Sequence, residues 1–188
     1  MLKDGMRLRL AQCAIAALAL AGSATAMADQ FGVQLAGGLA NHNGNKEEKI
    51  DLGGVWDPNF TFWPIGGYHF TLVGEAHVAY WHPTSGPNPN NVVEFGLGPV
   101  LRFERASGDI RPYVEWGEGL RLLSHARIND NYTMSTAFQF SDMVGVGVKF
   151  GDRAQYQVGF RFQHMSNASI KHPNPGVNFE QLLLQYNF

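Results

Sequence analysis

The sequence contains one cysteine, Cys13, among 188 residues, and its charge is nearly balanced, with 14 Lys and Arg against 16 Asp and Glu. Residues 29–188 contain no cysteine, so no disulfide can stabilise this part of the chain. No cluster of basic residues is present, which argues against a nucleic-acid partner. No apolar run beyond residue 28 approaches the length of a membrane-spanning helix. A membrane location would therefore require a closed β-barrel, because lipid offers no partners to backbone N–H and C=O groups.

Residues 1–28 are typical of a secretory signal peptide. A basic start precedes a short apolar run at residues 14–20, and small residues follow. We expect cleavage after Ala28, with cleavage after Ala26 as the close alternative. The apolar run is too short to span a membrane. A lipoprotein is disfavoured because most of the apolar run follows Cys13 instead of preceding it. Residues 29–188 then form a single exported domain.

Eight segments of the remaining chain alternate between apolar and polar residues, which predicts β-strands. The expected strands are residues 30–41, 50–57, 68–81, 91–104, 110–125, 136–150, 155–166 and 177–188. One face of each strand is apolar, and the other carries Gly, Gln and charged residues. An even number of such strands is typical of a small outer-membrane barrel. The predicted fold is all-β, an eight-stranded antiparallel transmembrane β-barrel.

Alternation alone does not say which face lies inside the barrel. A soluble lipocalin-like barrel would place the apolar face inside, and a membrane barrel would place it outside. The polar face carries several charged residues, namely Glu94, Arg102, Glu104, Glu115, Arg121, Lys149 and Arg161. The signal peptide and the terminal Phe188, which resembles the assembly signal of outer-membrane barrels, favour the membrane orientation. In that orientation the charged residues fill the interior of the barrel.

His164 and Ser166 lie two residues apart near the end of the strand at 155–166, so they share one face. The same face carries Phe160 and Phe162, and it is therefore expected to contact lipid. With both ends of the barrel on the periplasmic side, His164 and Ser166 lie at the outer end. Asn178 and Glu180 fall on the same face of the neighbouring strand. Polar groups in this position are costly in lipid, which suggests a function.

A serine hydroxyl becomes a nucleophile when a neighbouring base takes its proton, and histidine is the usual base. His164 and Ser166 are roughly 7 Å apart at Cα, so their side chains can meet. Glu180 or Asn178 would then orient the imidazole. A lone His-x-Ser pair is a weak signal, however, and two interface residues without chemistry would look the same. No metal or cofactor is required for this chemistry.

The segment from His164 to Lys171 resembles the lipid A 3-O-deacylase family (PagL), whose marker is H-x-S-N-A near the C-terminus of an eight-stranded outer-membrane barrel. Further likeness lies at residues 111–115, 123–127 and 138–142. The resemblance implies hydrolysis of the ester-linked acyl chain at position 3 of lipid A, at the outer leaflet of the outer membrane. It also implies that Ser166 is the nucleophile and His164 the base.

The family pattern has an acidic residue after a Gly-apolar pair, and this sequence has Asn178 there, with Glu180 two residues later. We favour Glu180 as the third member of the triad, because it is charged and shares the face, and keep Asn178 as the alternative. The oxyanion is expected to be bound by backbone N–H groups just after Ser166, with Asn167 as the side-chain candidate.

Two other functions fit a small barrel. An adhesin or structural anchor would need long outer loops, and the loops of this sequence are modest. A lipid acyltransferase would need an apolar interior to measure its acyl chain, and the predicted interior is polar. Either a monomer or a homodimer is compatible with the sequence.

Overall fold

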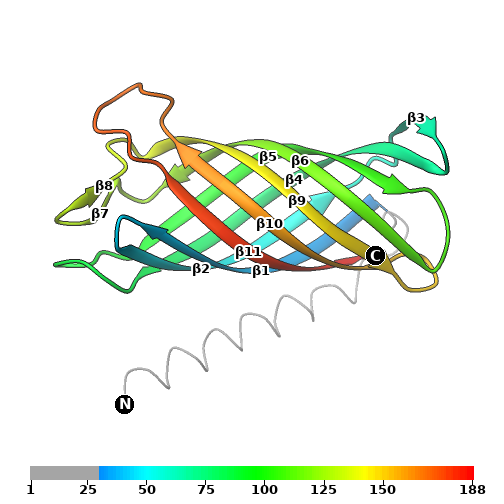
Figure 1. Ribbon diagram of the computed structural model, residues 1–188, viewed down its shortest axis with the longest axis horizontal. Coiled ribbons are helices and arrows are strands. Elements are labelled where there is room, and N and C mark those ends of the chain that lie inside the picture. The colour runs from blue at the N-terminus through cyan, green and yellow to red at the C-terminus, as the bar shows by residue number, and fades with distance from the viewer. Residues whose placement is uncertain (1–29) are drawn as a thin grey trace, which may run out of the picture.

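The computed structural model describes residues 30–188, so the expected signal peptide lies outside the described residues. None of the described residues belongs to a helix that is long and apolar enough to cross a membrane. Eight long strands form one antiparallel sheet that closes on itself through β2 and β4 (Figure 1). These strands are β1 (Phe31–His42), β2 (Asn45–Trp56), β4 (Tyr68–Pro83), β5 (Val92–Arg105), β6 (Ile110–Leu123), β9 (Phe138–Phe150), β10 (Tyr156–Ser166) and β11 (Val177–Asn187). The predicted eight-stranded barrel is confirmed.

Three short strands lie in the connections between the long ones. β3 (Thr61–Ile65) pairs with β4 at the end of the barrel near the C-terminus. β7 (Arg127–Asn129) and β8 (Tyr132–Thr133) form a hairpin at the opposite end, in the loop between β6 and β9. The sequence patterns assigned these short segments to loops, because each is too short to show an alternation.

β2 begins at Asn45, five residues earlier than the alternation indicated. The alternation predicts a connecting loop between the expected strands at 30–41 and 50–57, but Asn43 and Gly44 alone make the turn, with φ values of 50° and 86°. Asn-Gly is a preferred pair for a two-residue hairpin turn in which both residues have positive φ. β1 and β2 are therefore paired up to His42 and Asn45.

The apolar faces of the strands point out of the barrel. Leu97, Val146 and Phe160 are 64%, 54% and 43% exposed, whereas Arg102 and Glu115 are 1% and 5% exposed. This arrangement is that of a membrane barrel and excludes the lipocalin-like alternative. His164 and Ser166 follow Phe160 and Phe162 at alternate positions of the same strand, so their side chains also point outward.

The interior is filled by ion pairs between strands that are distant in sequence. The Arg161 guanidinium donates to Glu115 at 2.6 Å and to both carboxylate oxygens of Glu75 at 2.8 and 2.9 Å. Arg102 bonds to the same two carboxylates, at 2.8 Å to Glu115 and 2.9 Å to Glu75. Two cations and two anions are thus paired within one buried cluster, which satisfies charges that would otherwise be very unfavourable here.

Arg161→Ala is expected to destabilise the barrel by about 3–5 kcal/mol, because it leaves two buried carboxylates with one guanidinium between them. The measurement is denaturant unfolding of the protein refolded in detergent micelles. Arg127→Ala is the matched control: the ion pair of Arg127 with Asp130 is about half exposed, and its loss should change stability by less than about 1 kcal/mol. Equal unfolding midpoints for the two variants would contradict this role of Arg161.

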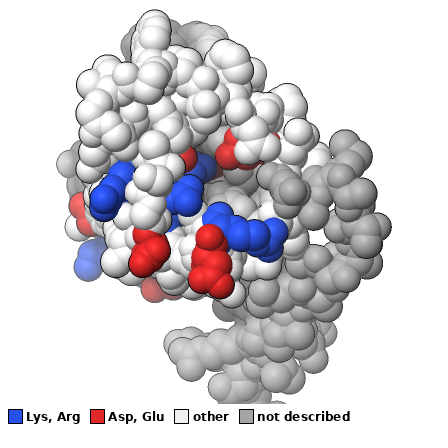
Figure 2. Space-filling model, turned by 90° about the vertical axis from the view of Figure 1, so that its right-hand side faces the viewer, with Lys and Arg blue, Asp and Glu red and all other residues white. Residues whose placement is uncertain are grey.

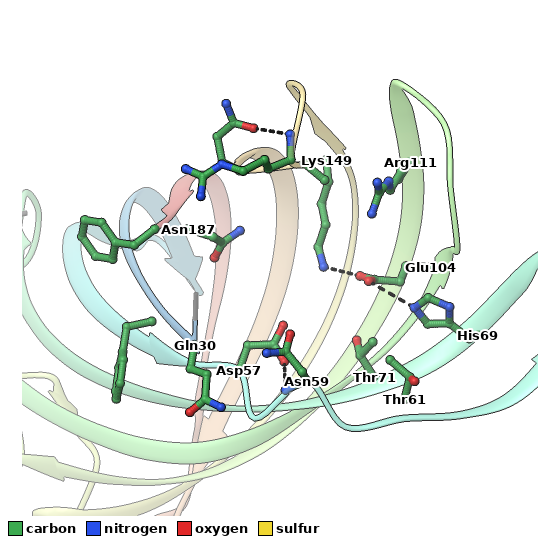
Figure 3. Close-up of a pocket in the computed structure, with 15 residues that line it drawn as sticks. Gln30, Asp57, Asn59, Thr61, His69, Thr71, Glu104, Arg111, Lys149 and Asn187 are labelled. Carbon is green, nitrogen blue, oxygen red and sulfur yellow. Dashed lines mark hydrogen bonds and ion pairs between the residues drawn. The ribbon is translucent and has the colours of Figure 1, made fainter. Parts of the chain in front are cut away.

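A polar cavity of about 430 Å³ opens at the end of the barrel that carries the C-terminus. Figure 2 shows this end of the molecule, where basic and acidic side chains are mixed. Within the cavity Glu104 accepts from Lys149 and lies 3.5 Å from His69 Nε2 (Figure 3). His164 and Ser166 belong to the outer end of β10, so this cavity is not the site predicted from the sequence.

Candidate active site

β10 presents His164 and Ser166 on its outward face and ends at Ser166. Both side chains are half-buried, while Met165 between them is fully buried and points into the barrel. Met165 packs in an apolar cluster with Val177 and Phe179 of β11. This cluster closes the outer end of the interior and anchors the two strands from which the site is built.

His164 contacts Asn178 on the neighbouring strand. The two residues are directly opposite in the β10–β11 register, and His164 Nδ1 lies 2.6 Å from Asn178 Oδ1. Glu180 is opposite Phe162, one pair further along the same face. Within residues 30–188, no hydrogen bond or ion pair joins Glu180 to His164. The geometry therefore favours Asn178 over Glu180, the residue preferred from the sequence, as the group that orients the imidazole.

The contact with Asn178 decides which ring nitrogen is available to Ser166. An amide oxygen can only accept, so Nδ1 carries the hydrogen in this contact and Nε2 keeps its lone pair. Ser166 is placed two residues along the same face, and no hydrogen bond joins its Oγ to the ring in the described chain. Such contacts are often long in an enzyme without substrate and shorten when substrate binds.

The loop at residues 167–176 packs against the histidine ring. Gly176 adopts φ 66°, and a Cβ placed on it would lie 2.8 Å from His164 Cε1. The Gly176 carbonyl accepts a 2.5 Å hydrogen bond from the Tyr132 hydroxyl of β8. Burial, together with the charge of Glu47, raises the pKa of Tyr132, so the phenol stays protonated and remains a donor. The hairpin of β7 and β8 thus holds this loop beside the ring.

Gly176→Ala is expected to lower catalytic activity by roughly 10- to 100-fold, because a small displacement of a catalytic group has effects of this size. The new methyl group would displace the His164 ring, and φ 66° is strained for alanine. Rates of the purified variant in micelles would measure the loss. Gly44→Ala is the matched control, since Gly44 also has positive φ but its Cβ would meet nothing within 4 Å. Equal activity of the two variants would show that contact with His164 is unimportant.

Asn167 does not reach the surface where an oxyanion would form. Its side chain is fully buried, and its Nδ2 donates to the carbonyls of Met134 and Lys171 at 3.1 and 2.9 Å. Its backbone N–H donates to Asn174 Oδ1 at 3.0 Å. Asn167 therefore holds two loops together, and its amide hydrogens are already used.

The next two residues offer unused donors instead. Ala168 and Ser169 have φ values of 50° and 63°, and the turn that they form is closed by a 3.0 Å bond from Ile170 N–H to the Asn167 carbonyl. Within the described chain, no hydrogen bond involves the N–H groups of Ala168 and Ser169. Two non-glycine residues with positive φ store strain, which is commonly found at functional sites. These two N–H groups are therefore the candidates for binding an oxyanion.

Two carboxylates on the outward face were missed by the sequence interpretation. Glu118 of β6 and Asp142 of β9 are exposed and directly opposite one another, and Asp142 is also opposite His164. Each of these carboxylates interrupts a strand face that is otherwise apolar. This interruption was the sequence signal that could have identified them. In the described part of the chain, no group of three or more His, Cys, Asp or Glu residues could hold a metal ion.

Comparison with known proteins identifies the family of this chain. The family model described as lipid A 3-O-deacylase (PagL) matches residues 48–187. The chain belongs to this family. The matched range includes every residue of the site described above. The block from His164 to Ala168, on which the sequence resemblance rested, therefore lies inside the family match.

Two relatives and one solved structure support the assignment to the PagL family. The chain is 32% identical to the lipid A deacylase PagL of Bordetella bronchiseptica over 177 residues, which covers 93% of both proteins. It is 31% identical to the lipid A deacylase PagL of Pseudomonas aeruginosa over 126 residues, or 67% of this chain and 70% of that protein. The crystal structure of the outer membrane enzyme PagL superposes with a TM-score of 0.70 and 26% identity, covering 82% of this chain and 99% of that one.

Proposed function

We propose that this protein is a lipid A 3-O-deacylase of the outer membrane, which hydrolyses the ester-linked 3-hydroxyacyl chain at position 3 of lipid A. The observation that carries the proposal is the outward position of His164 and Ser166 beside Phe160 and Phe162, in a chain of the PagL family. A membrane lipid can reach a site on this face without leaving the bilayer. A water-soluble ester, in contrast, would have to approach a site that faces lipid.

In the first half of the reaction Ser166 Oγ attacks the ester carbonyl carbon and His164 Nε2 takes the hydroxyl proton. The carbonyl oxygen becomes an oxyanion that the N–H groups of Ala168 and Ser169 stabilise. When this intermediate collapses, the bond to the sugar oxygen breaks, and His164 returns the proton to that oxygen. The products are a free 3-hydroxyl on the sugar and an acyl group on Ser166.

In the second half a water molecule attacks the acyl-serine, and His164 takes one of its protons. Collapse of the second intermediate releases the fatty acid and returns the proton to Ser166 Oγ. Asn178 acts by orientation: its Oδ1 accepts a hydrogen bond from His164 Nδ1, with 2.6 Å between these two atoms, so Nε2 is left for the reacting groups in both halves. Glu180 and the Asn167 side chain take no part in these steps.

The rest of the chain serves export and assembly in this proposal. Residues 1–28 act as a signal peptide that is removed after Ala28, and residues 29–188 form the barrel. The site draws its catalytic side chains from β10 and β11 of one chain, so a monomer is sufficient for activity, and a homodimer would contain two independent sites. No cofactor or metal takes part.

The test is the mass of lipid A extracted from a lipopolysaccharide-bearing host that lacks such an enzyme, with and without this protein. We expect lipid A that is lighter by one hydroxyacyl chain and an equal amount of released 3-hydroxy fatty acid. Lipid A with an additional acyl chain would show an acyltransferase instead. Unchanged lipid A from cells with correctly inserted protein would favour the structural anchor.

A further inference from the structure

A groove of about 470 Å³ on the outward face begins at Asn178 and crosses β11, β1 and β2. The side chains that line it and matter here are Leu39, Asn41, Lys46, Glu48, Asn178 and Glu180. Because Asn178 also contacts His164, the groove is continuous with the proposed active site. It lies on the opposite side of His164 from Asp142.

The strand register arranges these side chains in two rows. Asn41 is opposite Lys46, and both lie level with the end of β11 that carries Asn178. Leu39 is opposite Glu180 on one side and Glu48 on the other. The row nearer the outer loops therefore carries the amides of Asn178 and Asn41 and the ammonium group of Lys46. The second row carries two carboxylates on either side of a leucine.

The charged ends of these side chains have no partner within residues 30–188. No hydrogen bond or ion pair there involves Lys46 Nζ or the carboxylates of Glu48 and Glu180. The Lys46 backbone is nevertheless fixed, since its N–H donates to Ser85 Oγ at 2.7 Å and its carbonyl accepts from Thr84 N–H at 2.8 Å. The strand thus holds Lys46 in place while its ammonium group stays available to an external anion.

The two carboxylates are not placed to share a cation. Glu48 and Glu180 flank the same leucine from strands on either side of it, so their backbones are about 9–10 Å apart by the spacing of adjacent strands. Two carboxylates at that separation suit separate hydrogen bonds from hydroxyl or amide groups better than one bound ion. The cation among the residues that line the groove is Lys46.

We propose, on the basis of the function above, that this groove binds the phosphorylated sugar of the lipid substrate and that Lys46 pairs with a phosphate group. Lipid A is a phosphorylated glucosamine disaccharide that carries acyl chains. Its sugar hydroxyl and amide groups match the carboxylate acceptors on Glu48 and Glu180. A sugar held in the groove leaves its neighbouring ester within reach of Ser166, and the acyl chain remains against the apolar surface of Phe162.

The test compares wild-type protein with Lys46→Gln on two substrates, lipid A and the same lipid A with its phosphates removed. On phosphorylated lipid A, Lys46→Gln should raise KM roughly 10-fold with little change in kcat, as expected for loss of one charge-assisted hydrogen bond. On dephosphorylated lipid A the two proteins should have the same KM. A loss of equal size on both substrates, or no loss on either, would overturn the role of Lys46.

Arg105→Gln serves as the control for net charge, because Arg105 is exposed at the end of β5, opposite Tyr68, at the other end of the barrel from the groove (Figure 1). It should leave KM unchanged on both substrates. To separate this proposal from the proposed function, the same comparison is made by direct binding of the two lipids to Ser166→Ala protein, with and without Lys46→Gln. A phosphate-dependent loss of affinity in the binding assay supports the groove even if the wild-type protein shows no deacylation. Its absence contradicts the groove even if deacylation is found.

Discussion

Ser166→Ala and His164→Ala are each expected to lower the rate of 3-O-deacylation by a factor on the order of 10⁴ to 10⁶, and the double variant is expected to be no slower than either single variant. The nucleophile and its base act as one unit, so removing one partner makes the other useless. Rates of fatty acid release by purified protein in mixed micelles measure the effect. A residual rate above that in buffer alone would come from binding and from the Ala168 and Ser169 N–H groups.

A second serine-histidine pair in the outer loops provides a stringent control. Ser124 Oγ lies 3.0 Å from His125 Nδ1 and also accepts from the Val93 N–H at 3.1 Å. Ser124→Ala should keep the wild-type rate, because Ser124 comes from the loop after β6 and its Oγ contacts His125 and Val93, not His164. If Ser124→Ala abolished deacylation while Ser166→Ala did not, the nucleophile assigned here would be wrong.

The barrel could be predicted because it rests on a local signal that repeats along the chain. Each strand alternates with period two, and residues such as Arg102 and Glu115 fall on the face opposite Leu101 and Trp116. The orientation of that alternation needed further reasoning from the signal peptide and the terminal Phe188. The start of β2 was missed because its first residues are polar on both faces, although Asn43-Gly44 is a strong turn signal.

The details of the site depend on pairing between strands, which the sequence does not display. Glu180 and Asn178 share one face, and only the register shows that Asn178 is opposite His164 while Glu180 is opposite Phe162. The burial of Asn167 follows from contacts with Met134 in a loop more than thirty residues away. The sequence interpretation named Asn167 as a candidate oxyanion donor, because its use as a link between two loops could not be foreseen.

Asn178→Ala is expected to reduce kcat by roughly 10²- to 10⁴-fold, the range typical of the loss of a group that supports a general base. The His164 ring would lose the 2.6 Å contact at Nδ1, and both its orientation and its tautomer would become variable. Asn178→Asp should restore the activity to at least the wild-type rate, because a carboxylate oxygen of the same reach accepts from Nδ1 and also stabilises the imidazolium that forms during the reaction. Steady-state kinetics of the three proteins would measure these changes.

Glu180→Ala is the matched comparison, since Glu180 lies on the same strand and the same face but opposite Phe162. Its kcat should stay within a few-fold of the wild-type value, and any effect should appear in KM, because Glu180 lines the groove and does not contact the histidine ring. Loss of kcat in Glu180→Ala with normal kcat in Asn178→Ala would make Glu180 the third member of the triad. The chain would then use the acidic residue two positions later than the family pattern, and the histidine would have to turn away from the contact seen here when substrate binds.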